Sequence, residues 1–267
     1  MSSLARALRI AIGTVVYAFD SVLGLVPAFN RRNRASGVVL LYHGVPAVDR
    51  QRFARQLSTL DRYGTVVPLE RMLVPADGTW RFAITFDDAL ESFGRVGVDE
   101  LAMRSWPSTV FVPSAQMGRA PAWENAETYG DDVLSAPELV ELKKQHVEIG
   151  SHSRHHVRLP DLDRATIDDE VGGSRIELER EIGDPARYFA YPWGDWSDTV
   201  VDACRNAGYE RTFTVSPEPV RDPDTYLVPR VTVHTSDSAW EFRLKALGAY
   251  RWVGTWMRLK RALRRDR

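Results

Sequence analysis

Two short segments of the sequence carry side chains that could form a hydrolytic metal site. Thr85-Phe86-Asp87-Asp88 ends an apolar run with two adjacent carboxylates, and the stretch 150–156 places His152 and His156 four residues apart. One aspartate with two histidines supplies three ligands to a borderline divalent ion and leaves a position for water, as a catalytic zinc site requires. The other aspartate is then available to accept a proton from that water.

Each segment also has an ordinary interpretation. Paired aspartates usually lie on a solvated surface or cap a helix, and histidines four apart often form a polar helix face. The run Phe82-Ala83-Ile84 before Asp87, however, is typical of a buried strand. A carboxylate pair at its end would be desolvated at a cost of several kcal/mol unless a cation lies beside it. The surface interpretation leaves that cost unexplained.

The two segments resemble the first and second motifs of the polysaccharide deacetylase (NodB-homology) family, Thr-Phe-Asp-Asp-Gly and His-Ser/Thr-x-x-His. Other stretches are similar to further parts of that family and occur in the expected order. They are an opening strand at 41–45, a barrel strand at 106–112, the third motif at 189–194 and a closing strand at 228–233. The resemblance therefore covers residues 37 to about 235.

By that resemblance, Asp87 is the expected general base, and Asp88, His152 and His156 are the expected metal ligands. The implied cofactor is one divalent ion, with zinc expected and cobalt, nickel or manganese as alternatives. The implied reaction is hydrolysis of a carbon–nitrogen bond that removes an N-acetyl group from an amino sugar. The metal would lower the pKa of a water molecule and polarise the carbonyl.

The third motif and the closing strand supply further candidates. A backbone amide in the turn of Tyr191, Pro192 and Trp193 is the expected second donor to the oxyanion. His234 follows the closing strand, where the family places a histidine that protonates the leaving amine. An equally open interpretation is an imidazole that is held by a backbone carbonyl.

The sequence departs from the family pattern at three positions. Ala89 replaces the glycine of the first motif, so a positive φ there would be strained. Ala190 stands where many members carry an arginine that orients the base, which leaves the partner of Asp87 unassigned. Thr232 replaces a leucine of the last motif.

Several rings near the motifs are candidate substrate contacts. His43 ends a strand that should reach the same barrel mouth, and Trp193 and Trp196 could stack on a sugar ring. Trp123 is better interpreted as hydrophobic cover over a loop. His155 has the wrong spacing for a ligand and is expected to face solvent or a neighbouring carboxylate.

Apolar runs alternate with helical patterns along the middle of the chain. Phe53, Leu57 and Leu60 have helical spacing and precede an extended run at 65–67. This alternation predicts a parallel sheet with helical crossovers, and about seven such strands predict a distorted, partly open β/α barrel, which the resemblance also implies. The active site then lies at the carboxyl ends of the strands. The long connection 114–135 is expected to be a lid or substrate-binding element.

Composition is typical of one sizeable globular domain with extensions. The 267 residues are 44% hydrophobic and show no internal repeat. We expect a membrane-interface segment at 1–35, the catalytic domain at 36–240 and a basic amphipathic helix at 241–267. The single cysteine, Cys204, excludes an intramolecular disulfide and gives no hint of an oxidising compartment.

The two ends of the chain are basic and its middle is acidic. Residues 1–34 carry a formal charge of +4 and residues 243–267 carry +8; because the whole chain carries −1, the middle carries −13. This asymmetry indicates that both ends meet something anionic. Nucleic acid is not the expected partner, since no binding motif accompanies the charge.

The N-terminal stretch 10–29 is almost wholly apolar and long enough to span a bilayer. Asp20 at its middle makes crossing costly, and no signal-peptide cleavage site is evident. We therefore expect a peripheral or monotopic segment at the cytoplasmic face of the inner membrane, although spanning stays open.

The C-terminal stretch favours the same partner. Trp252, Trp256, Leu259 and Leu263 recur at helical spacing among basic residues, which suits an anionic leaflet. The alternative is that the tryptophans pack on the barrel and the basic tail is solvated.

The leading hypothesis is a metal-dependent deacetylase that acts at the membrane on a lipid-linked sugar or an envelope glycan. One alternative is a deformylase of a lipid-linked amino sugar. Another is a non-catalytic barrel that binds glycan, against which the retention of Asp87, Asp88, His152 and His156 argues.

Overall fold

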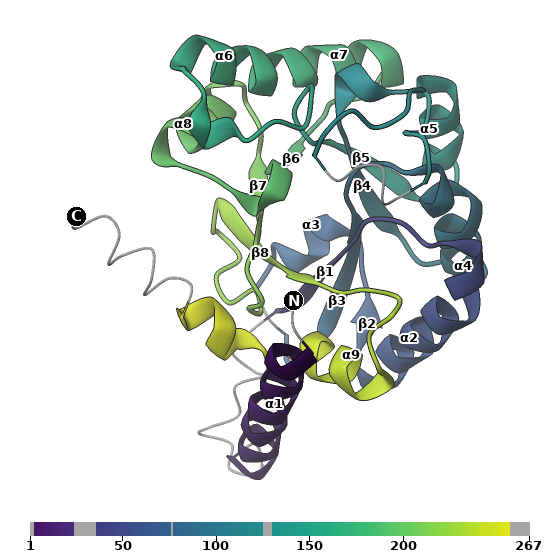
Figure 1. Ribbon diagram of the computed structural model, residues 1–267, viewed down its shortest axis with the longest axis vertical. Helices are drawn as coiled ribbons and strands as arrows, with labels where there is room; N and C mark the ends of the chain where they lie inside the picture. Colours follow the sequence, from purple (N-terminus) through teal and green to yellow (C-terminus); the bar gives the residue numbers. More distant parts are fainter. Residues whose placement is uncertain (1–2, 24–35, 76, 125–129, 257–267) are drawn as a thin grey trace.

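The computed structural model describes residues 3–23, 36–75, 77–124 and 130–256 (Figure 1). Its strands form one parallel sheet in the order β1-β8-β7-β6-β5-β4-β3-β2, and a further pairing of β1 with β3 closes the sheet on itself. The strands are β1 (Gly37–Tyr42), β2 (Thr65–Val66), β3 (Arg81–Phe86), β4 (Ser108–Val112), β5 (Val147–Ser151), β6 (Tyr188–Ala190), β7 (Arg211–Val215) and β8 (Leu227–Thr232).

The closed ring contains seven of these strands, so the predicted β/α barrel is confirmed. The eighth strand, β2, pairs only with the first two residues of β3, on the edge where β4 pairs with its last two. The ring is complete rather than open, and it is thinnest between β5 and β6, where one residue pair, Ser151 and Phe189, joins the strands. This thin seam is where the barrel is distorted.

Helices surround the barrel on its outer face (Figure 1). They are α1 (Ser3–Leu23), α2 (Arg50–Tyr63), α3 (Leu69–Met72), α4 (Val98–Ala102), α5 (Ala136–Lys143), α6 (Arg164–Asp168), α7 (Ser174–Ile182), α8 (Asp198–Asn206) and α9 (Ala239–Ala246). Because helices cover one face of the strands and the barrel interior lies on the other, every residue of β1, β3 and β4 is buried. In α2, the predicted apolar stripe of Phe53, Leu57 and Leu60 is buried against the barrel.

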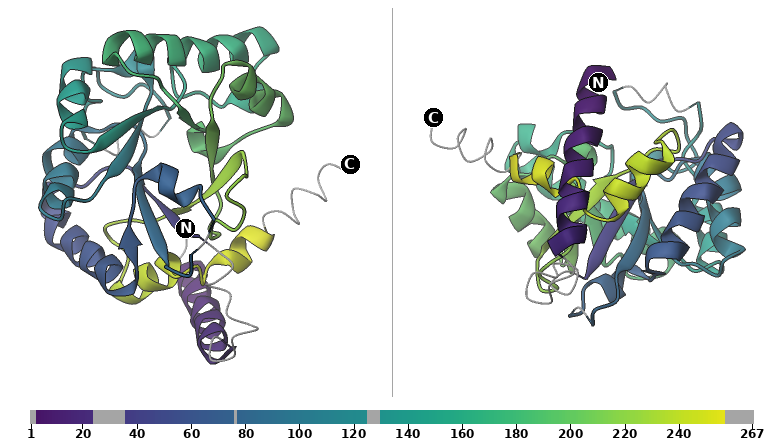
Figure 2. Two further views of the ribbon diagram at one scale, coloured as in Figure 1. Left: turned by 180° about the vertical axis from the view of Figure 1, so that it is seen from behind. Right: turned by 90° about the horizontal axis from the view of Figure 1, so that it is seen from below.

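The terminal helices α1 and α9 pack against each other beside the barrel (Figure 2). The face of α1 that packs on the protein body is mixed. Arg6 lies 2.7 Å from Glu241, and the Tyr17 hydroxyl accepts a hydrogen bond of 2.5 Å from Arg243. Ile10 and Val16 pack against the apolar cluster around Leu244, whereas large apolar side chains on the other face, such as Leu8 and Phe19, are exposed. In the described part of the chain, no helix combines the length and apolar character that crossing a membrane requires.

The C-terminal extension consists of α9, a turn at 247–250 and a helical stretch at 251–256. Trp252 packs against the cluster of Leu244, Ala249, Tyr250 and Val253, which α1 also contacts, rather than on a barrel strand. Trp256 is half exposed. Leu259 and Leu263, together with residues 24–29 of the N-terminal apolar stretch, lie outside the described residues.

Candidate active site

The two carboxylates at the end of β3 point to different partners because the backbone turns between them. Asp88 and Ala89 have φ values of 71° and 50°, in the left-handed region. The positive φ that the first motif suggested is therefore present, and an alanine adopts it at a cost of about 1 kcal/mol. After this turn the Asp88 side chain faces β5, whereas Asp87 faces β8.

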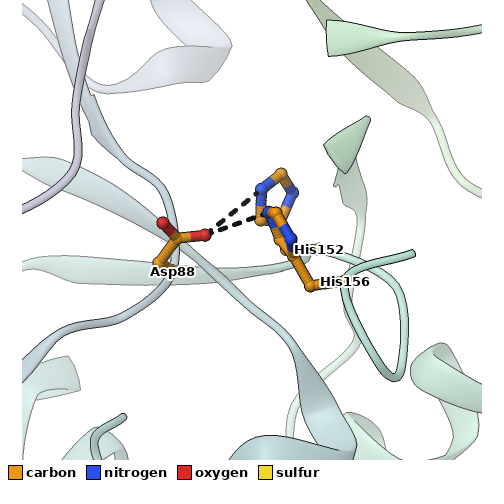
Figure 3. Close-up of side chains that lie close together, drawn as sticks. All are labelled: Asp88, His152 and His156. Carbon is orange, nitrogen blue, oxygen red and sulfur yellow. Dashed lines mark ion pairs between the residues drawn. The ribbon is translucent and has the colours of Figure 1, made fainter. Parts of the chain in front are cut away.

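Asp88 and two imidazoles form one buried cluster (Figure 3). An Asp88 carboxylate oxygen lies 3.6 Å from Nε2 of His152 and 3.3 Å from Nε2 of His156, and one ligand atom of each residue lies within 4.8 Å of the others. All three side chains are at most 5% exposed. The predicted ligands are therefore brought together.

This cluster fits a divalent cation. Donors that lie about 2.0–2.1 Å from a tetrahedral ion are separated by about 3.3–3.4 Å, close to the two measured distances from Asp88. Two imidazole nitrogens and a carboxylate are also the donors that zinc and its neighbours accept.

The loop after β5 orients both imidazoles. Nδ1 of His152 lies 2.8 Å from the Ala190 carbonyl oxygen, so its proton is directed there and the lone pair of Nε2 is directed towards Asp88. Ser153 has a φ of 64°, and its hydroxyl oxygen accepts a 3.0 Å hydrogen bond from the His156 amide. The four-residue spacing of the histidines therefore belongs to a tight loop rather than to a helix face.

Arg230 is the functional residue that the sequence analysis missed. It is fully buried on β8 and forms two hydrogen bonds to the Asp87 carboxylate, of 2.6 and 2.8 Å. Arg230 takes the role of the arginine that many family members carry in the third motif, where this chain has Ala190. The available signal was a single charged residue in the middle of the apolar strand 228–233.

Arg230 keeps Asp87 ionised. Burial by itself raises the pKa of the Asp87 carboxyl group. Arg230 and the neighbouring imidazole of His152 lower this pKa by more than burial raises it, so the net shift is downward. His152 Nε2 lies 3.7 Å from Oδ2 of this carboxylate. Asp87 is thus an anion beside the metal cluster and is not part of it.

The imidazoles of His43 and His234 lie on the side of the site near β8. Burial lowers the pKa of His43 to about 4, and this pKa also responds to Asp87, His152 and His234. His43 is therefore near enough to the cluster and to His234 to interact electrostatically with both. The latter follows β8 at the rim, where its amide donates to Asp237 and its carbonyl accepts from Gln56.

In the turn after β6, one amide suits the predicted role of oxyanion donor. The Tyr191 amide donates to the Phe213 carbonyl, and Pro192 has no amide hydrogen. The Trp193 amide, at a φ of 62°, donates to no carbonyl among the described residues. The Trp193 ring lies 5.2 Å from the His156 ring, which places this turn beside the cluster.

Three further candidate residues take different positions. Trp123, from the connection 114–135, packs on the His156 ring at 4.5 Å, so this residue covers a predicted ligand. His155 lies 2.6 Å from a Glu170 carboxylate oxygen, as expected for a residue outside the ligand set. Trp196 lines a different pocket, with Thr214 and Pro219.

Removing one predicted ligand should weaken metal binding. We expect the metal-free protein to bind one Zn²⁺ per chain, and His152→Ala to lower the affinity by about 100-fold or more, because one of three ligands is lost. Competition with a chromogenic chelator measures both values. His155→Ala, an adjacent imidazole outside the cluster, is the matched control, and equal affinities in the two variants would contradict the assignment.

The metal-free protein should lose stability in acid. Burial lowers the pKa of His156 to about 2, so below the unfolded value of about 6.5 the unfolded chain binds the extra proton and acid favours unfolding. His156 then contributes up to about 1.4 kcal/mol per pH unit between about pH 6.5 and pH 2. Urea unfolding at several pH values measures this slope. His156→Ala should flatten it, and an unchanged slope would show that this imidazole is not held neutral.

Comparisons with known proteins agree with this geometry. The family model described as "Polysaccharide deacetylase" matches residues 77–212, just over half of the chain. The poly-beta-1,6-N-acetyl-D-glucosamine N-deacetylase of Staphylococcus aureus is 26% identical over 190 residues, which are 67% of this chain. The chain spans 60% of the length of that relative.

Solved structures extend the likeness to most of the fold. IcaB from Ammonifex degensii is 26% identical with a TM-score of 0.70, over 81% of this chain and 98% of that one. The Streptococcus pyogenes deacetylase PplD, solved in complex with acetate, shares the fold at 18% identity and a TM-score of 0.66, over 80% of this chain and 99% of its own. With its barrel and motif residues in place, the chain belongs to the polysaccharide deacetylase family.

Proposed function

We propose that the protein is a metal-dependent hydrolase that removes N-acetyl groups from an amino-sugar glycan. The observation that carries this proposal is the buried cluster of Asp88, His152 and His156 beside an ionised Asp87. The S. aureus relative is named for deacetylation of poly-β-1,6-N-acetyl-D-glucosamine, which supports a glycan substrate. A catalytically silent barrel would have no need for the buried Asp87–Arg230 pair.

The residues divide the work of amide hydrolysis among them. Asp88, His152 and His156 would hold the cation, which would supply Lewis acidity to activate water and polarise the acyl carbonyl. Asp87 accepts the proton of the attacking water. The Trp193 amide donates a hydrogen bond to the oxyanion as the carbonyl carbon becomes tetrahedral.

The remaining groups set the conditions for these steps. Arg230 holds the Asp87 carboxylate in place through its two hydrogen bonds, so the base does not rotate away from the water. His234, at the rim beyond β8, protonates the leaving amine. Trp123 and Trp193 flank His156 and limit the access of bulk water to the cluster.

We place the enzyme at the membrane surface, at the cytoplasmic face of the inner membrane, where it acts on a lipid-linked or envelope glycan. The support is the outward face of α1. Five of its large apolar side chains are each more than half exposed: Leu4, Leu8, Val15, Phe19 and Val22. Together with the +4 and +8 charges of the two ends, this face suits an anionic leaflet better than water.

Loss of the base should abolish catalysis without loss of metal. We expect Asp87→Asn to lower kcat for acetate release from an N-acetylglucosamine oligosaccharide by about 10³-fold, within the range that general base catalysis contributes. Acetate release and zinc content are measured on the same samples. Asp99→Asn, an exposed carboxylate on α4, is the matched control. A zinc-loaded wild type that releases no acetate would refute the proposed reaction.

Charges placed on the outward face of α1 should release the protein from membranes. We expect the wild type to float with phosphatidylglycerol vesicles and the double variant Leu8→Glu/Phe19→Glu to stay in the soluble fraction, because inserting two carboxylates into the interface is unfavourable. Met103→Glu/Ile176→Glu adds the same charge at exposed apolar positions elsewhere. Equal flotation of all three proteins would refute the membrane placement.

A further inference from the structure

A second pocket, of about 650 Å³, lies where the barrel rim meets the terminal extensions. The barrel contributes Thr232, the last residue of β8, and His234, two residues further along. Helix α1 contributes Arg9, and the C-terminal extension contributes Tyr250 and Trp256. Figure 2 shows α1 and the C-terminal extension side by side at this edge of the barrel. The pocket therefore forms where the segments that precede and follow the barrel in the sequence meet the end of β8.

Most of the charged groups in this pocket neutralise one another. Arg6 lies 2.7 Å from Glu241 and 3.8 Å from Asp237, and Lys245 lies 2.7 Å from Asp237 and 3.6 Å from Glu241. These two cations and two anions form a closed network without net charge. Arg9 forms no ion pair with a carboxylate of the described residues. The pocket therefore carries one positive charge in excess.

Tyr250 adds an unsatisfied donor. Its side chain is 5% exposed, and its hydroxyl has no hydrogen-bond partner among the residues that the structure describes. Burial raises the pKa of this hydroxyl, so that it stays protonated and can donate. A buried hydroxyl without a partner costs about 1–3 kcal/mol, and a ligand with acceptor oxygens removes that cost.

The rest of the lining is mainly apolar. Val215, Pro217, Val231 and Val253 contribute it, and the half-exposed Trp256 completes the wall. A ligand that satisfies both parts carries an acceptor-rich anion next to a hydrocarbon segment. A phosphate ester of a lipid has this composition, whereas a neutral glycan would leave Arg9 without a counter-charge.

The pocket adjoins the catalytic site. Thr232 and His234 follow Arg230 at alternate positions, on β8 and just beyond it, so the end of the strand that positions Asp87 also forms a pocket wall. His43 interacts electrostatically with both His234 and His152. A ligand that is anchored in the pocket can therefore present its other end to the cluster.

We propose that this pocket binds the phosphate and the first hydrocarbon units of a lipid-linked amino sugar and holds the sugar over the catalytic site. The inference rests on the proposed function and names the anchor of its substrate. Arg9 and the Tyr250 hydroxyl contact the phosphate oxygens, and the apolar wall receives the chain. The outward face of α1 contacts the bilayer in which the hydrocarbon chain of this lipid is embedded.

Binding of farnesyl phosphate to the zinc-loaded protein, measured by calorimetry, tests the pocket directly. We expect Arg9→Gln to raise the Kd by about tenfold and Tyr250→Phe by about threefold, as for hydrogen bonds to a charged group. Arg62→Gln, an exposed arginine on α2, is the matched control and should bind as the wild type does. A Kd that neither pocket variant changes would overturn the proposal.

Two further probes distinguish the sources of a phosphate group. Inorganic phosphate should bind at least about tenfold more weakly than farnesyl phosphate, since it leaves the apolar wall unused; equal affinity would overturn the lipid part. Phosphatidylglycerol vesicles should retain Arg9→Gln as they retain the wild type. Loss of flotation with unchanged farnesyl phosphate binding would assign Arg9 to a bilayer headgroup and overturn the substrate role.

Activity separates this proposal from the proposed function. The ratio of kcat/KM for farnesyl-phosphate-linked N-acetylglucosamine to kcat/KM for an N-acetylglucosamine oligosaccharide should fall about tenfold in Arg9→Gln. An unchanged ratio in an active enzyme would overturn the pocket and leave the deacetylase standing. If farnesyl phosphate binding depends on Arg9 but the protein releases no acetate from either substrate, the pocket stands and the deacetylase is overturned.

Discussion

The bidentate contact of Arg230 with Asp87 is the interaction on which the rest of the site depends. Two adjacent carboxylates are buried at the end of β3, and each needs a positive charge because burial of an isolated carboxylate is strongly unfavourable. The left-handed turn at Asp88 and Ala89 directs the two carboxylates to different positive partners. Asp87 is satisfied by a fixed guanidinium, which leaves Asp88 and the two imidazoles for an exchangeable cation. A base and a ligand thus arise from neighbouring residues of one strand end.

The sequence predicted those parts of the site that local spacing determines. The barrel, the ligand set and the positive φ at Ala89 could all be inferred from motifs of a few residues. Arg230 could not, because its partner lies 143 residues away and strand neighbours in a barrel are not encoded by local pattern. The pocket at Arg9 and Tyr250 could not be predicted from the sequence for the same reason, since it forms only when the two ends of the chain meet.

Helix α1 illustrates a second limit of sequence patterns. An amphipathic helix is normally expected to bury its apolar stripe. The sequence predicted an almost wholly apolar stretch at 10–29 and did not indicate which of its side chains would pack. Here the packed face is mixed: Ile10 and Val16 pack against the cluster around Leu244, while Arg6 pairs with Glu241 and Asp20 with Arg251. Other large apolar side chains of the helix stay exposed. Periodicity identifies the faces of a helix, but the partners available in the fold determine which face packs.

The position of Arg230 on the last strand also orders events during synthesis. As the ribosome releases the chain, the β3 carboxylates emerge long before the guanidinium that neutralises one of them, and β8 must pair with both β7 and β1 to deliver it. An incomplete barrel therefore exposes repelling charges instead of a competent base. Closure of the ring and assembly of the catalytic base are therefore coupled, because both require β8 to pair with β7 and β1.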